Sequence, residues 1–354
     1  MATKHELLDL IDRAVADGWE HRRACRYLEL DEGRAWRWRR RRDAGCLGDL
    51  KPGSAVHGLR PEEVTAILEL FEAWGEVDRS HRKLAHRGSY TQKVWVSPAT
   101  VRRVLAAHGL VLKRPRRPGR SERRPFPEWA DYRRNSIYIY DVTHFAGCPK
   151  HAVFAVMDLV TRKWICELVS IEETSTQVQV VFLDALEAEG LLELVEARQD
   201  APPPDPLSLD ADVDVLPPVL LAVSDNGPQM TSTDTRAFMA MCAIAQHFGR
   251  PGTPTDQAWI ESLFSHVKAD WPHLDRIRDP EVLRAELAVV RHDYNTVRLH
   301  AGIGYVTPAD EHDGRGPQIR AARKRGLRHA RWARIAYHQL QKAKANRRSP
   351  TDVD

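Results

Sequence analysis

The sequence predicts a mixed α/β core that follows small all-α domains and precedes a basic helical tail. Two observations predict it. Apolar residues recur at helical spacing between residues 5 and 109, whereas from about residue 135 short apolar runs alternate with helical stretches, as in a layered α/β domain. The charge follows the same division, because residues 1–128 carry a net charge of +9, residues 129–312 carry −14 and residues 313–354 carry +9.

The changes in composition divide the chain of 354 residues into five segments. We expect a helix-turn-helix domain (1–48), a second helix-turn-helix-like domain (55–112), a basic linker (113–128), a catalytic core with an insertion at about 199–217 (129–312) and a basic C-terminal tail (313–354).

Basic ends around an acidic middle indicate arms that bind nucleic acid around a core with a different task. Solvated surface charge explains a mild excess, but it explains this segregation poorly. No run approaches the roughly 18 apolar residues of a membrane span, and the first residues lack the pattern of a signal peptide. The five cysteines are far apart and form no Cys-x-x-Cys pair, which favours reduced thiols in a cytoplasm.

The N-terminal segment reads as three short helices, of which the last two, 20–28 and 32–42, are joined by a tight turn. The last helix can enter a DNA major groove. We predict DNA contacts from four of its arginines: Arg34, Arg37, Arg39 and Arg40. The alternative is a solvated basic face with two core tryptophans, Trp36 and Trp38. DNA contact is favoured because closely spaced arginines repel one another unless phosphates neutralise them.

The second helical unit ends in a helix over 98–108, which Ser97 caps and Gly109 stops. This helix carries Arg102 and Arg103, which we also expect to contact DNA. The linker that follows has seven basic residues within 113–124, beginning with Lys113 and Arg114. Its prolines favour an extended arm that tracks a phosphate backbone.

The core begins with strand-like alternation at 136–141 and ends in helices. The expected elements are strands at 136–141, 152–157, 163–169 and 220–223, and helices at 174–189, 232–245, 256–271 and 280–296. The insertion at 199–217 carries five prolines and five aspartates. We interpret it as a solvated surface loop and not as a metal site, because its spacing is irregular.

Three carboxylates lie where an α/β core presents reactive groups. Asp141 ends the first predicted strand, Asp225 follows a buried strand, and Glu261 lies in the first turns of a helix. Together they predict a site for hard divalent cations and phosphoryl chemistry. Lys268 shares the helix face of Glu261 and would meet DNA phosphate there. Taken singly, each acid could be a surface or capping carboxylate, and 224–227 could be a simple turn.

From about residue 20 to 312 the chain resembles bacterial insertion-sequence transposases with a retroviral-integrase core, especially the insertion-sequence-three group. The passages that carry the resemblance are 22–26 with 36–40, 141–145, 224–227, 260–268, 294–300 and 304–308. Thirty-five residues separate Asp225 from Glu261, the spacing for which this family of two aspartates and a glutamate is named. The chain departs from the family at Leu299, where proline is usual, and at Asp256, where asparagine is expected. A zinc-binding N-terminal module is absent from the pattern.

The resemblance implies an RNase H-like core in which Asp141, Asp225 and Glu261 bind two Mg²⁺ (or Mn²⁺) ions. It implies cleavage at the ends of a mobile element and strand transfer into target DNA. The partners would be double-stranded DNA, both element ends and target, and further copies of this chain in at least a dimer. No membrane would be involved, and the protein would lie in the bacterial cytoplasm, on the nucleoid. Arg298 and His300 would contact DNA near the site or have a structural role. The alternatives are a DNA-binding regulator, which would not need the three acids, and a metal-dependent nuclease without joining activity.

Overall fold

The computed structural model describes residues 2–45, 47, 55–110, 132–145, 150–200, 217–249 and 258–347. The chain forms two compact units, one of residues 1–58 and 334–354 and the other of residues 59–333. Three predicted features lie outside the described residues: the basic linker with Lys113 and Arg114, most of the insertion at 199–217, and Asp256 with the expected start of its helix.

The N-terminal part of the first unit is a bundle of three helices: α1 (Ala2–Ala16), α2 (His21–Tyr27) and α3 (Glu32–Asp43). Its small core is made of Ile11, Ala24, Cys25 and Ala35. The Asp31 carboxylate accepts a hydrogen bond from the Arg34 N–H at 2.8 Å and so caps α3. The three helices coincide with those that the sequence predicts.

The second unit begins with three helices: α4 (Pro61–Asp78), α5 (His81–Tyr90) and α6 (Pro98–Ala107). Their core includes Ile67, Leu84 and Leu105. The Ser97 hydroxyl caps α6 at Thr100 N, as its sequence predicts.

A five-stranded sheet in the order β3-β2-β1-β4-β5 forms the centre of the second unit. The strands are β1 (Ile137–Phe145), β2 (His151–Asp158), β3 (Trp164–Ser170), β4 (Leu220–Ser224) and β5 (Ile244–Phe248). β1, β2 and β3 pair antiparallel, whereas β1, β4 and β5 pair parallel. This is the mixed sheet of an RNase H-like fold, and the predicted fold class is confirmed.

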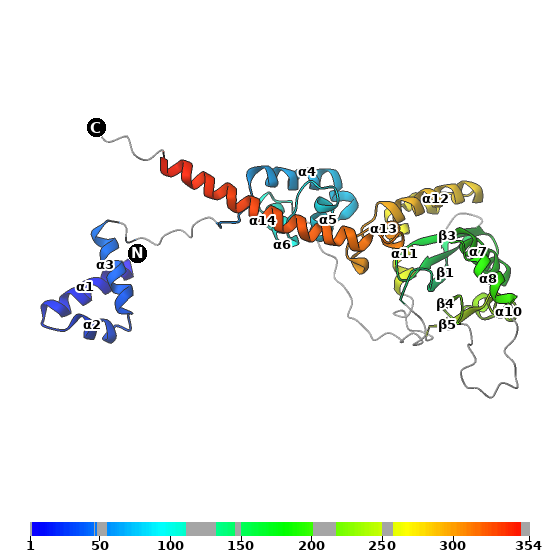
Figure 1. Ribbon diagram of the computed structural model, residues 1–354, viewed down its shortest axis with the longest axis horizontal. Helices are drawn as coiled ribbons and strands as arrows, with labels where there is room; N and C mark the ends of the chain where they lie inside the picture. The colour runs from blue at the N-terminus through cyan, green and yellow to red at the C-terminus, as the bar shows by residue number, and fades with distance from the viewer. Residues whose placement is uncertain are drawn as a thin grey trace, which may run out of the picture. The chain divides into compact units, whose positions relative to one another are not determined.

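Helices cover both faces of the sheet (Figure 1). Ile137, Ile139 and Phe145 of β1 pack against α11 and α12, while the alternate residues Tyr138 and Tyr140 lie in the second core, beneath α7 and α10. The helices of the two layers are α7 (Ser175–Ala188), α8 (Leu192–Gln199), α9 (Pro228–Thr231), α10 (Thr233–Met241), α11 (Ala258–Asp270) and α12 (Pro280–Thr296).

Two expectations about the sheet were wrong. β1 does not end at Asp141, because β2 pairs with it as far as Phe145. The helix expected at 232–245 ends at Met241. Ala243 then adopts a left-handed φ of 52°, and Ile244 begins β5, which pairs with β4. The local pattern did not show β5, because its five residues gain their hydrogen bonds only from a strand more than twenty residues away.

After α12 the chain closes with α13 (Pro308–His312) and the long helix α14 (Gly316–Arg347), as the basic tail's helical pattern predicts. Among the described helices, none is long and apolar enough to cross a membrane.

Candidate active site

The sheet register brings Asp141 and Asp225 to the same level of neighbouring strands. β1 and β4 run parallel with Ile139 opposite Val223. Asp141, within β1, and Asp225, directly after β4, are each two residues beyond this pair and so lie at the same level. Neighbouring strands lie about 4.8 Å apart. Asp141 is two residues beyond Ile139 in β1 and therefore points to the same face of the sheet, which α11 covers.

Glu261 reaches the same region from α11. This helix buries Ile260, Leu263 and Val267 against the sheet and leaves Glu261 exposed in its first turn. Burial is the main cause of the raised pKa of Asp141, and the negative charges of Asp225 and Glu261 raise it further. Three acids that the sequence separates by up to 120 positions are thus brought within electrostatic range of one another.

The electrostatics at Asp141 are those of an uncompensated carboxylate. Burial, with the charges of Asp225 and Glu261 adding to it, raises the pKa of Asp141 to about 7, against the opposing effect of the hydrogen bond from the Val142 N–H at 2.8 Å. Glu261 is exposed, but the partial burial of its carboxylate still raises its pKa. Within the described part of the chain, no lysine or arginine forms an ion pair with any of the three acids.

The donor set fits a hard divalent cation. Carboxylate oxygens are the ligands that Mg²⁺ and Mn²⁺ prefer, and a cation would remove a repulsion of about 1 kcal/mol per pair at ~4 Å even at the dielectric constant of water. The side chains are not closely gathered, since the described residues contain no group of three or more His, Cys, Asp or Glu placed to hold a metal ion. The backbone brings the three acids into the same region, but their side chains do not yet meet. To share an ion, the exposed side chains of Asp225 and Glu261 would have to turn towards it.

Asp225 also begins a turn, so the alternative interpretation of 224–227 holds alongside the site. Its Oδ1 accepts a hydrogen bond from the Gly227 N–H at 2.9 Å. Asn226 was missed by sequence reasoning. Its Nδ2 donates to the Gly249 carbonyl at 2.9 Å, and Gly249 N donates to the Ser224 carbonyl at 2.9 Å. Asn226 thus ties the end of β4, beside Asp225, to the end of β5.

Lys268 lies near the end of β1, with its Nζ 5.5 Å from the centre of the Phe145 ring. Phe145 shares the sheet face of Asp141, so the lysine is on the expected side of the sheet. Its contact with DNA stays a prediction.

Arg298 and His300 are engaged inside the protein. Arg298 Nη1 donates to Asp270 Oδ2 at 2.9 Å, and the His300 ring packs edge-on against Tyr294 with centroids 4.8 Å apart. Burial lowers the pKa of His300, and the nearby Arg298 lowers it further. These contacts give both residues a structural role, and a DNA contact by either stays a prediction.

The predicted arginines of α3 divide between two faces. Arg39 pairs with Asp12 of α1, as does Arg42 at 2.7 Å, which fastens α3 to α1. The opposite face exposes three others: Arg34, Arg37 and Arg40. Trp36 on that face is 57% exposed, so it is not the core tryptophan of the alternative interpretation. Arg102 and Arg103 are exposed on α6.

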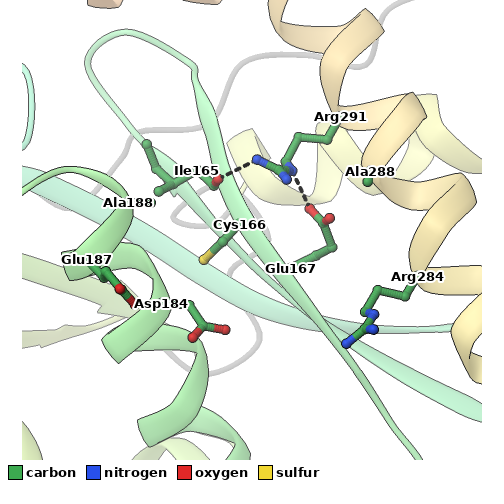
Figure 2. Close-up of a pocket in the computed structure, with 9 residues that line it drawn as sticks. All are labelled: Ile165, Cys166, Glu167, Asp184, Glu187, Ala188, Arg284, Ala288 and Arg291. Atoms are coloured by element: carbon green, nitrogen blue, oxygen red, sulfur yellow. Dashed lines mark hydrogen bonds and ion pairs between the residues drawn. The ribbon is translucent and has the colours of Figure 1, made fainter.

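A groove of about 420 Å³ lies along the outer strand β3, between α7 and α12, and none of the three acids lines it (Figure 2). Arg291 of α12 donates to the Ile165 carbonyl at 2.9 Å and pairs with Glu167 at 2.8 Å (Figure 2). Burial raises the pKa of Glu167 to about 7, although Arg291 opposes this. Next to it, Asn295 accepts from Trp164 N and donates to Trp164 O, at 3.0 and 2.8 Å. These side chains cap the free edge of the sheet, and they give the groove a structural explanation.

Comparison with known proteins adds to the geometry of the site. Two models of a family described as an integrase core domain match the chain, one over residues 131–254 and the other over residues 242–308. Together they reach from just before β1 to the start of α13 and include all three acids. The transposase for insertion sequence element IS904 of Lactococcus lactis subsp. lactis (strain IL1403) is 27% identical over 94 residues. This match covers 26% of the chain and 37% of that transposase.

Solved structures with partial similarity are retroviral. A chain of the simian T-cell lymphotropic virus intasome in complex with PP2A regulatory subunit B56 gamma has a TM-score of 0.38 at 16% identity, over 64% of this chain and 73% of its own. The catalytic core domain of BIV integrase has a TM-score of 0.34 at 19% identity, and the match covers 51% of this chain and 95% of that chain. The HTLV-2 integrase catalytic core domain in complex with magnesium has a TM-score of 0.35 at 18% identity, and the match covers 51% of this chain and 97% of that chain.

Proposed function

Because the chain belongs to the integrase core domain family, we propose that it is a DNA transposase that cuts the ends of a mobile element and joins them to target DNA. The observation that supports the proposal is that the backbone brings Asp141, Asp225 and Glu261 into one region, while no lysine or arginine of the described residues pairs with them. An uncompensated carboxylate cluster is costly to fold and is what a divalent cation needs.

Asp141, Asp225 and Glu261 would hold two Mg²⁺ or Mn²⁺ ions. Ions bound there supply the Lewis acidity that activates an attacking water or DNA 3′-hydroxyl and stabilises the leaving 3′ oxygen. The protein's own contribution is positioning. Adjacent parallel strands fix the spacing of Asp141 and Asp225, and Asn226 anchors the turn that carries Asp225. Lys268, on the same side of the sheet, would attract the incoming phosphate.

The N-terminal helices would recognise the element ends. Arg34, Arg37 and Arg40 project from the free face of α3, where a recognition helix presents base-reading and phosphate-binding groups. Two ends must be joined, so the active form would be a homo-oligomer on double-stranded DNA, with at least two copies.

The test is a joining assay with a labelled duplex that carries the element end and a plasmid target, in Mg²⁺ or Mn²⁺. We compare the parent with Asp225→Asn and with the control Asp234→Asn, which makes the same change at an exposed residue of α10. Joined product from the parent and the control, but not from Asp225→Asn, supports the proposal.

Other outcomes identify the alternatives. Binding of the element end by the parent without cleavage or joining would indicate a DNA-binding regulator. Cleavage that depends on Asp225 but gives no joined product would indicate a nuclease.

A further inference from the structure

Helix α14 has a charge distribution that the catalytic site does not explain. Over its 32 residues, Gly316–Arg347, it carries ten lysines and arginines and no aspartate or glutamate. Like charges three or four positions apart destabilise a helix. Such a sequence is stable where the protein, or a bound polyanion, compensates the charge.

One face of α14 is compensated by the protein. Arg320 pairs with Glu311 at 2.6 Å. Arg323 donates to the carbonyls of Gly304 and Tyr305 at 2.8 and 2.7 Å, and burial lowers its pKa.

The same face makes close contacts with the helical part of the unit. The guanidinium of Arg323 also donates to Ser89 Oγ, at the end of α5, at 3.0 Å. A Cβ built on Gly326 would lie 2.0 Å from Trp95 Nε1, so only glycine lets α14 approach this closely. The face is therefore fixed both to the segment that closes the core and to the unit's first three helices.

The opposite face is exposed and basic. It consists of Lys324, Arg325, Arg328, Arg331 and Trp332. Their spacing of one, four, seven and eight positions from the first places them on one side of the helix. Trp332 is 68% exposed. Among the described residues, none of the four cations forms an ion pair.

We propose that this exposed face of α14 binds the phosphate backbone of double-stranded DNA, independently of base sequence. The inference rests on the proposed function only for the identity of the polyanion. From Lys324 to Arg331 the helix rises about 10 Å, at 1.5 Å per residue. One DNA strand carries a phosphate for about every 3.4 Å of helix axis, so the face matches roughly three successive phosphates. Trp332 would pack against the sugars beside them.

The architecture favours DNA over an anionic membrane surface. A helix that lies on a bilayer buries an apolar face in the lipid. Here the face opposite the cations is packed against the protein, through Arg323 and Gly326. What remains for a partner is a row of charges on a rigid element, which suits a rigid polyanion. Because α14 is anchored beside the segment after His300, bound DNA would hold a fixed relation to the catalytic core.

The experiment measures binding of the full-length protein to a mixed-sequence duplex without element ends, in EDTA, over a range of salt concentrations. The neutral variant combines Lys324→Gln, Arg325→Gln, Arg328→Gln and Arg331→Gln. The matched control keeps the charge by combining Lys324→Arg, Arg325→Lys, Arg328→Lys and Arg331→Lys. Circular dichroism and thermal unfolding check that each variant is folded.

We expect the neutral variant to bind more weakly and its plot of log affinity against log salt to become shallower, by roughly 0.9 for each phosphate that the protein no longer neutralises. The charge-conserving control should keep the parent's slope, since binding to the DNA backbone needs charge and not a particular geometry. An unchanged affinity and slope in the folded neutral variant would overturn the proposal. Binding of the parent and the neutral variant to phosphatidylserine vesicles is measured as well. If the neutral variant loses vesicle binding but keeps duplex binding, the proposal is also overturned, because the face would then bind a membrane surface.

The outcome is separable from that of the proposed function. A shallower slope with no joining by the parent would leave the α14 surface standing and the transposase proposal refuted. Normal joining by the parent, with an unchanged slope in the neutral variant, would support the transposase proposal and refute the α14 surface.

Discussion

Two groups of carboxylates in the same unit have opposite electrostatic surroundings. Asp141, Asp225 and Glu261 lie in one region, and none of them pairs with a lysine or arginine of the described part of the chain. Burial raises the pKa of Asp141 to about 7, and the neighbouring acids add to this effect. Asp158 and Glu189 are surrounded by donors. Burial opposes ionisation of Glu189, yet hydrogen bonds from His312 and Lys163 lower its pKa to about 2.

The second group consists of Asp158 and Glu189 with His312 and Lys163, and we call it the His312 network. Both of its carboxylates accept several hydrogen bonds. Asp158 accepts from three backbone N–H groups, of Asn135, Val160 and Thr161, at 2.7–3.1 Å. Glu189 accepts from His312 Nε2 at 2.7 Å and from Lys163 Nζ at 2.6 Å. Burial acts to lower the pKa of His312, but the bonds to Asp158 and Glu189 outweigh it and raise the pKa.

The difference separates acids that stabilise the fold from acids that, in the proposed function, would bind a metal ion. A carboxylate whose partners are built into the chain stabilises the protein at neutral pH. One that lacks them destabilises it until a cation binds. Substitutions should therefore act in opposite directions on stability in the two groups.

The largest expected effect is that of Asp141→Asn. Metal-ion catalysis supplies several kcal/mol of transition-state stabilisation, so strand transfer should fall by roughly 10³-fold or more. In EDTA the variant should unfold at a temperature no lower than the parent's, because an uncompensated charge has been removed. We expect Mg²⁺ or Mn²⁺ to raise the unfolding temperature of the parent, and this rise should be absent in Asp141→Asn.

Thermal unfolding with and without the ions measures this, with Asp234→Asn as the control that keeps the parent's response. Marked destabilisation of Asp141→Asn in EDTA would contradict the comparison, since it would place Asp141 among the structural acids.

A substitution in the His312 network should lower the stability of the protein. His312→Leu leaves Asp158 and Glu189 buried with a donor missing, which costs about 3–5 kcal/mol for a broken buried pair. Urea unfolding measures the loss. The exposed His292→Leu on α12 is the matched control and should change stability by less than about 0.5 kcal/mol. A loss below about 1 kcal/mol in His312→Leu would show that the network is not structural.

Sequence reasoning predicted the α/β core, four of the five strands and the three acids for one reason. Strand alternation and helical spacing are local signals, and the acids follow local patterns at a strand, a strand end and a helix start. The register of β1 and β4 then brings Asp141 and Asp225 together, as a parallel pairing of those two strands requires.

The His312 network and the caps on β3 could not be predicted in this way. His312 and Glu189 are 123 positions apart, and Asn295 and Trp164 are 131 apart. No local period connects such pairs, because their contact depends on how α12 and α13 return to the sheet. The division of α14 into an anchored and a free face was hidden for the same reason, since all its arginines look alike in the sequence.

The smallest of the expected effects is a dependence of stability on pH that belongs to Glu189. Its folded pKa of about 2 lies below its ordinary value of 4.5. Its contribution is therefore fully present above about pH 4.5 and is lost as the pH falls towards 2. At 1.36 kcal/mol for each unit by which its pKa is lowered, the contribution of Glu189 is about 3 kcal/mol. His312 has the opposite sign: because its folded pKa is raised above 6.5, its contribution is complete below about pH 6.5 and is lost as the pH rises through the folded pKa.

The two signs together place the greatest stability of the His312 network between about pH 4.5 and 6.5. Other carboxylates also titrate in acid, so the informative quantity is the difference in unfolding free energy between the parent and Glu189→Gln across this range. That difference should shrink as the pH falls from about 4.5, because protonation removes from the parent what the substitution has already removed. The exposed Glu196→Gln on α8 should show no such convergence. A difference that stays constant down to about pH 2 would mean that Glu189 is not held ionised by His312 and Lys163, and the contrast with Asp141 would lose its electrostatic basis.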